Sequence, residues 1–236
     1  MRVAAVGDVH VGVDGRGALR QELVDVSGDA DVLLVAGDFT RHGSVAEAEV
    51  AAQEFADLGL PVLAVLGNHD YHAGASAAVA GALAAAGIWV LDGSAEVVQV
   101  GATRVGVAGV KGFGGGFAGA SGSDFGEQEM KDFVSYSRSE AQRLDRALST
   151  LEADVRLVLT HYAPVPDTLV GERLEIYPFL GSYLLEQVID RHQISLAVHG
   201  HAHLGCEAGM TAGGVPVRNV ARAVLDRPYA VYSVDP

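Results

Sequence analysis

Short apolar runs alternate along the chain with longer, alanine-rich amphipathic segments. Several of the short runs are apolar at successive positions, which is typical of strands covered on both faces. The expected strands are residues 3–6, 32–36, 62–66, 88–91, 97–100, 104–108, 155–160, 196–198, 206–211, 215–220 and 230–234. The expected helices are residues 17–26, 44–58, 76–86, 127–151 and 179–191. This order of elements predicts an α/β protein.

In two regions, residues 89–108 and 206–234, strands follow one another without a helix between them. This favours antiparallel or mixed pairing there. The dipeptide Asp92-Gly93 is a hairpin signal and predicts that two of the middle strands pair across it. Two sheets packed face to face, with helices outside, account for both halves of the pattern. Before the second helix, Ser44 and Glu47 form a capping-box sequence.

The chain has 236 residues, 49% of them hydrophobic and 19% charged, and no internal repeat, charge block or Pro-rich linker divides it. We therefore expect one globular domain over residues 1–236. No apolar stretch approaches the roughly 18 residues of a membrane helix. The apolar run at residues 3–6 is also too short for a signal-peptide core. These features predict a cytoplasmic protein without a membrane span.

Charge and cysteine content narrow the possible partners. The formal net charge is −14 and the only lysines are Lys111 and Lys131. A surface of this kind repels the phosphate backbone of nucleic acids, so a nucleic-acid partner is not expected. The single cysteine, Cys206, excludes an intramolecular disulfide and a thiol-rich metal site. We expect Cys206 to be a small buried hydrophobe.

Five of the apolar runs lead directly into residues of metal-ligating types. The carboxyl ends of strands are where ligand sites form in α/β sheets. Residues at positions i and i+2 of an extended segment point to the same side. Asp8 with His10, and His201 with His203, can therefore each present two ligands to one place. The candidate residues are Asp8, His10, Asp38, Asn68, His69, Asp70, His161, His201 and His203.

Each part of this set is weak evidence alone, because a strand-end aspartate is often a helix cap or turn former and a single histidine is usually structural. Taken together, the set brings several imidazoles and carboxylates to one place. Such a cluster is costly to remove from water unless a cation satisfies it. The sequence therefore predicts a metal site.

The same residues carry a family resemblance. In order, Asp8-x-His10, Gly37-Asp38, Gly67-Asn68-His69-Asp70, His161 and Gly200-His201-x-His203 resemble the signature of the calcineurin-like metallophosphoesterases, in particular the bacterial, phosphodiesterase-like branch. The resemblance implies a four-layer α-β-β-α sandwich of two mixed β-sheets with helices on both outer faces. It implies two metal ions, one held by Asp8, His10 and His203, the other by Asn68, His161 and His201, with Asp38 bridging both.

The types of ligand limit which metal ions and which reactions are expected. Imidazole and carboxylate ligands without thiolate suit two divalent ions drawn from Mn, Fe, Zn, Co or Ni, and the sequence does not select among them. Two such ions about 3.5–4 Å apart can share a water and lower its pKa, giving a metal-bridging hydroxide that attacks phosphorus. The bound ions leave the centre net positive, so we expect a small anionic phosphoester substrate in spite of the acidic chain.

Two residues are candidates for the catalytic step itself. His69 matches the family's non-ligand histidine, which implies a place beside the reacting phosphate, where it could protonate the leaving oxygen. Asp70 is expected to accept the other ring N–H of His69 and to fix its tautomer.

The other polar residues near the motifs carry weaker expectations. Ser/Thr protein phosphatases carry a phosphate-binding arginine four residues after the aspartate that corresponds to Asp38. Here His42 occupies that position and the arginine, Arg41, lies one residue earlier. Arg41 and His42 are therefore candidates for substrate contact. His72 is a candidate lining residue. His192 is expected at the surface, and His199 is expected to be packed rather than a ligand.

Several functions fit these residues. The first is a phosphodiesterase acting on cyclic nucleotides or another small diester, and the main alternative is a phosphomonoesterase or nucleotide pyrophosphatase. A metal-stabilised interaction module with negligible turnover is an alternative of another class. A lipid-linked diphosphate hydrolase would need an apolar patch, to which residues such as Phe113, Phe117, Leu174, Ile176, Tyr177 and Phe179 could contribute. The glycine-rich segment 112–122 lacks the sequence of a phosphate loop and predicts a flexible surface loop or a mobile lid.

Overall fold

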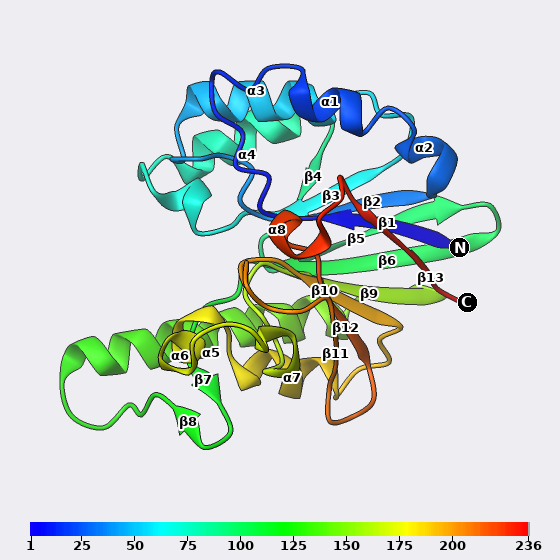
Figure 1. Ribbon diagram of the computed structural model, residues 1–236. Helices are drawn as coiled ribbons and strands as arrows, with labels where there is room; N and C mark the ends of the chain where they lie inside the picture. Colours follow the sequence, from blue (N-terminus) through cyan, green and yellow to red (C-terminus); the bar gives the residue numbers. More distant parts are fainter. Residues whose placement is uncertain (236) are drawn as a thin grey trace.

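The strands form two large sheets packed face to face in the computed structural model, which describes residues 1–235 (Figure 1). The first sheet has the order β13-β1-β2-β3-β4 and the second the order β11-β12-β10-β9-β6-β5. The first contains β1 (Arg2–Val6), β2 (Val32–Ala36), β3 (Val62–Val65), β4 (Trp89–Val90) and β13 (Ala230–Ser233). The second contains β5 (Ser94–Val100), β6 (Thr103–Val110), β9 (Val155–Thr160), β10 (Leu196–His199), β11 (Ala208–Met210) and β12 (Pro216–Asn219).

Both sheets are mixed. In the first, β1 to β4 run parallel, with Val3 opposite Val32, and only β13 is antiparallel. In the second, β6, β9, β10 and β12 run parallel, and the edge strands β5 and β11 are antiparallel. Parallel strands end at one edge of a sheet, so the segments that follow β1, β2 and β3, and those that follow β9 and β10, are gathered at common edges.

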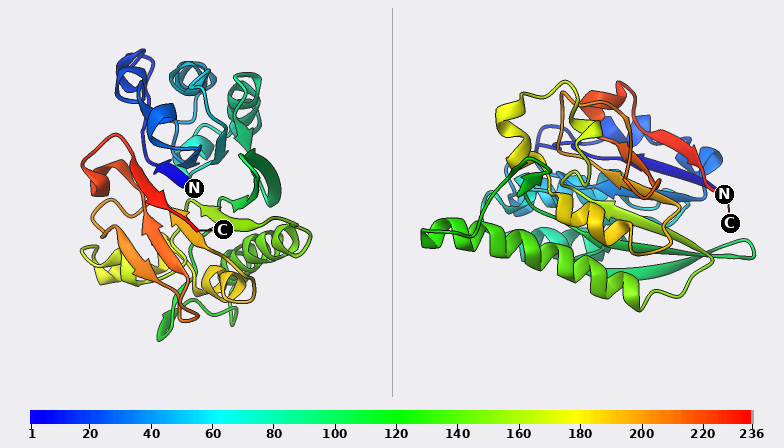
Figure 2. Two further views of the ribbon diagram at one scale, coloured as in Figure 1. Left: turned by 90° about the vertical axis from the view of Figure 1, so that its right-hand side faces the viewer. Right: turned by 90° about the horizontal axis from the view of Figure 1, so that it is seen from below.

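Helices cover the outer faces, as the end-on view in Figure 2 shows. Those on the first sheet are α1 (Ala18–Glu22), α2 (Val26–Asp29), α3 (Val45–Phe55) and α4 (Ser76–Ala85). Those on the side of the second are α5 (Gln128–Ser149), α6 (Tyr177–Leu180) and α7 (Tyr183–Ile189). One apolar core lies between the sheets, where Leu34 of β2 and Leu157 of β9 are fully buried. The predicted four-layer sandwich is confirmed.

Short elements complete the chain, and they include the glycine-rich segment. They are η1 (His69–Tyr71), η2 (Asp167–Leu169), η3 (Leu174–Ile176), α8 (Arg222–Leu225) and the two-stranded ribbon of β7 (Gly116–Phe117) and β8 (Ala120–Ser121). The N–H of Gly115 donates to the carbonyl of Pro178 at 2.7 Å, and that of Gly116 to Gly181 at 3.0 Å. Residues 114–117 are therefore buried against the α6 segment, and only residues 118–121 form an exposed tip.

Two local predictions have different outcomes. The capping box at α3 is confirmed: Ser44 Oγ accepts the N–H of Glu47, and the Glu47 carboxylate accepts that of Ser44, each at 3.3 Å. The hairpin at Asp92-Gly93 is wrong. Leu91 still bonds to Ala64 beside β3, whereas the N–H of Gly93 donates to Gly109 of β6, so the dipeptide crosses from one sheet to the other.

Two expected helices are divided. Residues 17–26 form α1 and α2 separately. The segment 179–191 breaks between α6 and α7, because Ala163 exchanges backbone hydrogen bonds with Leu180 and Ser182 on either side of Gly181. The hydroxyl of Ser182 then accepts the N–H of Leu184 and caps α7.

Candidate metal centre

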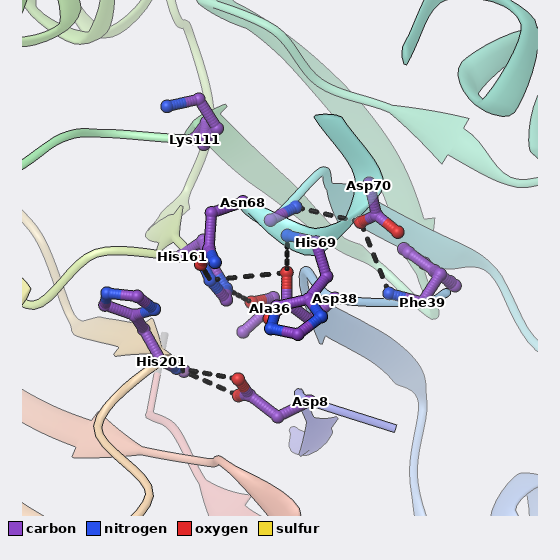
Figure 3. A network of polar contacts seen from close by, with 12 residues as sticks. Asp8, Ala36, Asp38, Phe39, Asn68, His69, Asp70, Lys111, His161 and His201 are labelled. Carbon is purple, nitrogen blue, oxygen red and sulfur yellow. Dashed lines mark hydrogen bonds and ion pairs between the residues drawn. The ribbon is translucent and has the colours of Figure 1, made fainter. Parts of the chain in front are cut away.

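The predicted ligands converge where the two sheets meet. Asp8 follows β1, Asp38 follows β2 and Asn68 follows β3, while His161 follows β9 and His201 follows β10. Figure 3 shows these side chains directed toward one another from both sheets. Residues far apart in the chain are in contact here: the N–H of His201 donates to both oxygens of Asp8, 193 positions earlier, at 2.9 and 3.1 Å.

Asp38 stands between two sets of potential ligands. Its Oδ2 lies 3.8 Å from Nε2 of His10, and its Oδ1 lies 3.5 Å from Nε2 of His161. Beyond these contacts, Nε2 of His203 lies 2.9 Å from Oδ1 of Asp8, and Nε2 of His161 lies 2.8 Å from Oδ1 of Asn68. The two carboxylate oxygens of Asp38 thus face different imidazoles.

Three groups bring ligand atoms within 4.8 Å of one another. They are Asp8, His10 and His203; His10, Asp38 and His69; and Asp8, Asp38 and His161. The ring of His201 stands outside these groups and packs beside that of His161, with 4.8 Å between ring centroids. Nε2 of His201 lies 3.3 Å from the carbonyl of Phe179. A ring nitrogen facing a carbonyl carries the proton, so Nδ1 of His201 keeps the free lone pair.

The backbone at the strand ends is unusual. Asp8, His10, Asp38 and His201 all have positive φ, between 45° and 70°, although none is glycine. Such conformations cost about 1–3 kcal/mol each and are typical of functional sites. Gly37 is required for a second reason: its φ is +86°, and a Cβ there would lie 2.7 Å from Nδ1 of His161.

The electrostatics of the site suit a cation. Asp8 and Asp38 are only 5% and 1% exposed, and within residues 1–235 neither forms an ion pair with lysine or arginine. Burial alone raises the pKa of Asp8, but the hydrogen bond from His203, the charges of His161 and His203 and the backbone N–H of His201 together outweigh it and lower that pKa to about 2. Burial lowers the pKa of His201 to about 3, so its ring is neutral at physiological pH. Two buried carboxylates that lack a lysine or arginine partner, surrounded by imidazoles, form a donor set that fits a divalent metal ion.

The structure corrects the expected partnership of His69 and Asp70. The Asp70 carboxylate is fully buried and accepts the N–H groups of Phe39, Thr40 and Gly67, together with the hydroxyl of Thr40. The His69 ring instead places Nδ1 2.8 Å from the carbonyl of Arg41. Because a carbonyl only accepts, Nδ1 is the protonated nitrogen and Nε2 is the free one. Asp70 thus anchors the Asp38 and Asn68 loops to each other, and a backbone carbonyl sets the tautomer, which side-chain motifs do not reveal.

The predictions for His199, His192 and Cys206 have different outcomes. His199 is fully buried as predicted, with Nδ1 facing the Gly200 carbonyl and Nε2 facing the Thr168 hydroxyl, each at 2.7 Å. His192 is not a surface residue: its side chain is 15% exposed and Nε2 lies 2.9 Å from Asp145. Cys206 is only partly buried, and its thiol donates to the carbonyl of Asp167.

Of the residues proposed for substrate contact, His42 pairs with Glu47 at 3.0 Å. Arg41 pairs with Asp14 at 3.3 Å, with both side chains exposed. The ring of His72 lies 6.3 Å from that of His69, at the edge of the cluster. The structure therefore places none of the three among the converging ligand atoms.

Comparison with known proteins decides the family. The sequence model described as "Calcineurin-like phosphoesterase" matches residues 1–205. The chain belongs to this family. Its members are metal-dependent hydrolases of phosphoesters, and the Asp and His groups described above are placed to hold a metal ion. No curated protein matches the chain in sequence.

Solved structures share the fold of this calcineurin-like phosphoesterase. One is a phosphopantetheinyl hydrolase from Mycobacterium tuberculosis, 13% identical, with a TM-score of 0.70 over 99% of this chain and 96% of the other. Another is a phosphatase from Mycoplasma pneumoniae, 14% identical, with a TM-score of 0.53 over 94% of this chain and 71% of the other. At these identities the likeness concerns the fold alone. Among residues 1–235, no helix has the length and apolar character needed to cross a bilayer.

Proposed function

We propose that this calcineurin-like phosphoesterase is a dinuclear enzyme, in which Asp38 is shared between two divalent ions. The observation that carries the proposal is the position of the Asp38 carboxylate, with one oxygen toward His10 and the other toward His161. Asp8, His10 and His203 would complete one site, and Asn68, His161 and His201 the other. When bound, two such ions supply a water-derived nucleophile and neutralise the phosphoryl oxygens.

The protein residues position the remaining groups. The N–H of His69 donates to Oδ1 of Asp38 at 2.8 Å, so the candidate acid is tied to the bridging carboxylate through its own backbone. With Nδ1 held at the Arg41 carbonyl, Nε2 of His69 is the nitrogen available to give a proton to the leaving oxygen. Asp70 holds both loops in register and does not act on the substrate.

The proposed substrate is a small anionic phosphoester, with a phosphodiester such as a cyclic nucleotide as the first choice. The formal charge of −14 disfavours a nucleic-acid polymer. A phosphomonoester is the second choice, and it is supported by the structural likeness to a protein named as a phosphatase. The metal-stabilised interaction module remains the alternative without turnover.

Metal reconstitution tests the proposal. Protein stripped with a chelator is expected to be inactive on bis(p-nitrophenyl) phosphate and to recover on addition of Mn²⁺, with two ions bound per chain. Asp38→Asn should lower both the metal content and the turnover by more than about a hundredfold, because even second-layer changes cost roughly 10–100-fold. Asp132→Asn, on the exposed face of α5, is the matched control and should behave as the parent.

The outcomes separate the alternatives. A single bound ion in the parent would refute the dinuclear proposal. No turnover of the diester or of p-nitrophenyl phosphate with any divalent metal would favour the interaction module. Faster turnover of the monoester than of the diester would select the phosphomonoesterase.

A further inference from the structure

Lys111 is a buried lysine that the phosphoesterase chemistry does not use. It follows Val110 at the end of β6 and is 6% exposed. Its carbonyl accepts the N–H groups of His161 and Tyr162, at 2.9 and 3.1 Å, which fixes its backbone beside the metal centre. Figure 3 shows its side chain directed away from Asp8 and Asp38. The ammonium group therefore serves something other than the metal ligands.

The ammonium has no counter-ion in the described part of the chain. Four aromatic rings surround it, those of Tyr71, Phe113, Tyr136 and Tyr162, with 5.0–5.3 Å from Nζ to each ring centroid. Its one hydrogen bond goes to the carbonyl of Gly112 at 2.9 Å. An ammonium carries three N–H donors, so two of them have no protein acceptor.

The neighbouring acids are engaged elsewhere. Glu140 accepts the N–H of Gly112 at 3.0 Å and pairs with Arg143 at 2.8 Å. Asp92 also pairs with Arg143, at 2.6 Å. Burial lowers the pKa of Lys111, and the more distant charges of Glu140 and Asp92 oppose that shift. The four rings stabilise the ammonium through cation–π contacts, but they leave two of its N–H donors without an oxygen acceptor. An anion that reached them would stabilise the buried charge further.

An open cavity is lined in part by Lys111. Its volume is about 170 Å³, and Leu66, Leu91 and Lys111 form its buried floor. Tyr71, Ala77 and Asp92 are exposed at its mouth, and Ala80 and Val90 line the wall. The volume is close to that of the apolar cavity of about 150 Å³ that accommodates benzene.

The start of α4 adds a second source of positive potential. Ser76 and Ala77 form its first turn and line the cavity. The N-cap residue is Ala75, which offers no side-chain acceptor to the N–H groups of that turn. The N-terminus of a helix carries a partial positive charge and attracts anions. The cavity thus combines apolar walls with Lys111 at its buried end and a helix N-terminus at its side, and the Asp92 carboxylate at its mouth is neutralised by Arg143.

We propose that this cavity binds a small organic anion, namely a carboxylate on an apolar body of about the size of benzene, with the carboxylate on Nζ of Lys111. The apolar wall disfavours a fully hydrated inorganic anion, and the ammonium disfavours a neutral hydrocarbon. Tyr71 lies two residues after His69 in η1, so the occupant contacts the segment that carries the candidate acid. The binding itself does not depend on the phosphoesterase proposal.

Calorimetric titration of the metal-loaded protein with benzoate tests the site, with benzyl alcohol as the neutral probe of similar shape. Benzoate is expected to bind one per chain, and benzyl alcohol more weakly. Lys111→Met keeps the bulk inside the aromatic rings and should weaken benzoate by about tenfold to a hundredfold, the value of a hydrogen bond to a charged group. Lys131→Met, at the exposed second lysine, is the matched control and should leave the affinity unchanged.

A second variant guards against misfolding of the first. Ala80→Leu fills the cavity from α4, leaves Lys111 in place and should exclude benzoate while metal content stays at the parent value. Benzoate binding that survives both Lys111→Met and Ala80→Leu would come from the metal centre and would overturn the proposal. So would the absence of benzoate binding in the parent, or equal affinity for benzoate and benzyl alcohol.

Discussion

Gly67→Ala tests how closely the loops of the metal centre approach one another. Gly67 follows β3, and a Cβ at this position would lie 2.5 Å from the backbone nitrogen and 2.7 Å from Cγ of Asp38. Real Cβ atoms essentially never come nearer than 3.0 Å to a neighbour, so the β2 and β3 loops must separate by about 0.5 Å. Metal–ligand distances tolerate only about 0.2 Å. The carboxylate of Asp38 would then no longer reach both of its partners.

The expected effect has two parts. Overpacking should lower the free energy of unfolding by about 1–3 kcal/mol, and the displaced carboxylate should weaken Mn²⁺ binding by about tenfold to a hundredfold. Urea unfolding of the metal-free protein measures the first, and calorimetric titration with Mn²⁺ measures the second. The control is Gly81→Ala inside α4, where the added methyl meets open space and should stabilise the protein by about 0.5–1 kcal/mol. If Gly67→Ala bound two ions with parental affinity, the close approach of these loops would be irrelevant to the site.

Three further predictions concern the acid, the bridge and the helix cap. His69→Ala should keep both metal ions by mass spectrometry but lose most diester turnover; loss of metal would make His69 a ligand instead. Removal of metal by chelation should lower the melting temperature of the parent, because an ion that binds only the folded state stabilises it. The same chelator should change the melting temperature of Asp38→Asn far less. Burial raises the pKa of Glu47, but hydrogen bonds from His42 and Ser44 outweigh it and leave this pKa below 4.5. The stabilisation that the ionised Glu47 gives the fold is therefore present above pH 4.5 and is lost as the pH falls further. In urea unfolding, the parent should be more stable than Glu47→Gln, and this difference should shrink below pH 4.5. A difference that grows on acidification would contradict the assignment.

Much of the fold is readable from local pattern. Residues 32–36 are apolar throughout, and residues 155–160 are interrupted only by Arg156 and the terminal Thr160, because the faces of both strands are covered. The structure gives both runs the same bounds. The error at Asp92-Gly93 is of another kind. Its turn chemistry is compatible with a hairpin, and only the pairing of Leu91 with β3 and of Gly93 with β6 sends the chain to the other sheet.

The candidate metal centre can also be predicted only in part from the sequence. Asp8, Asp38 and His161 could be selected because each follows a buried strand, and parallel strands gather their ends. The partner of the His69 ring could not, because it is a backbone carbonyl at Arg41, a group that every residue possesses. The surroundings of Lys111 were equally hidden, since its four rings come from η1, α5 and the segments after β6 and β9.

Four metal-site residues have a left-handed backbone, namely Asp8, His10, Asp38 and His201. Their conformation implies a trade-off between catalytic activity and thermal stability. Glycine adopts these angles freely, so replacing any one of them by glycine should relieve strain in the metal-free chain while deleting a ligand. A library screened only for survival of heating in the presence of a chelator should accumulate glycine at these positions and yield durable, inert proteins. Screening at the same temperature with Mn²⁺ supplied should instead retain the original residues at these positions, because bound ions compensate for the strained turns.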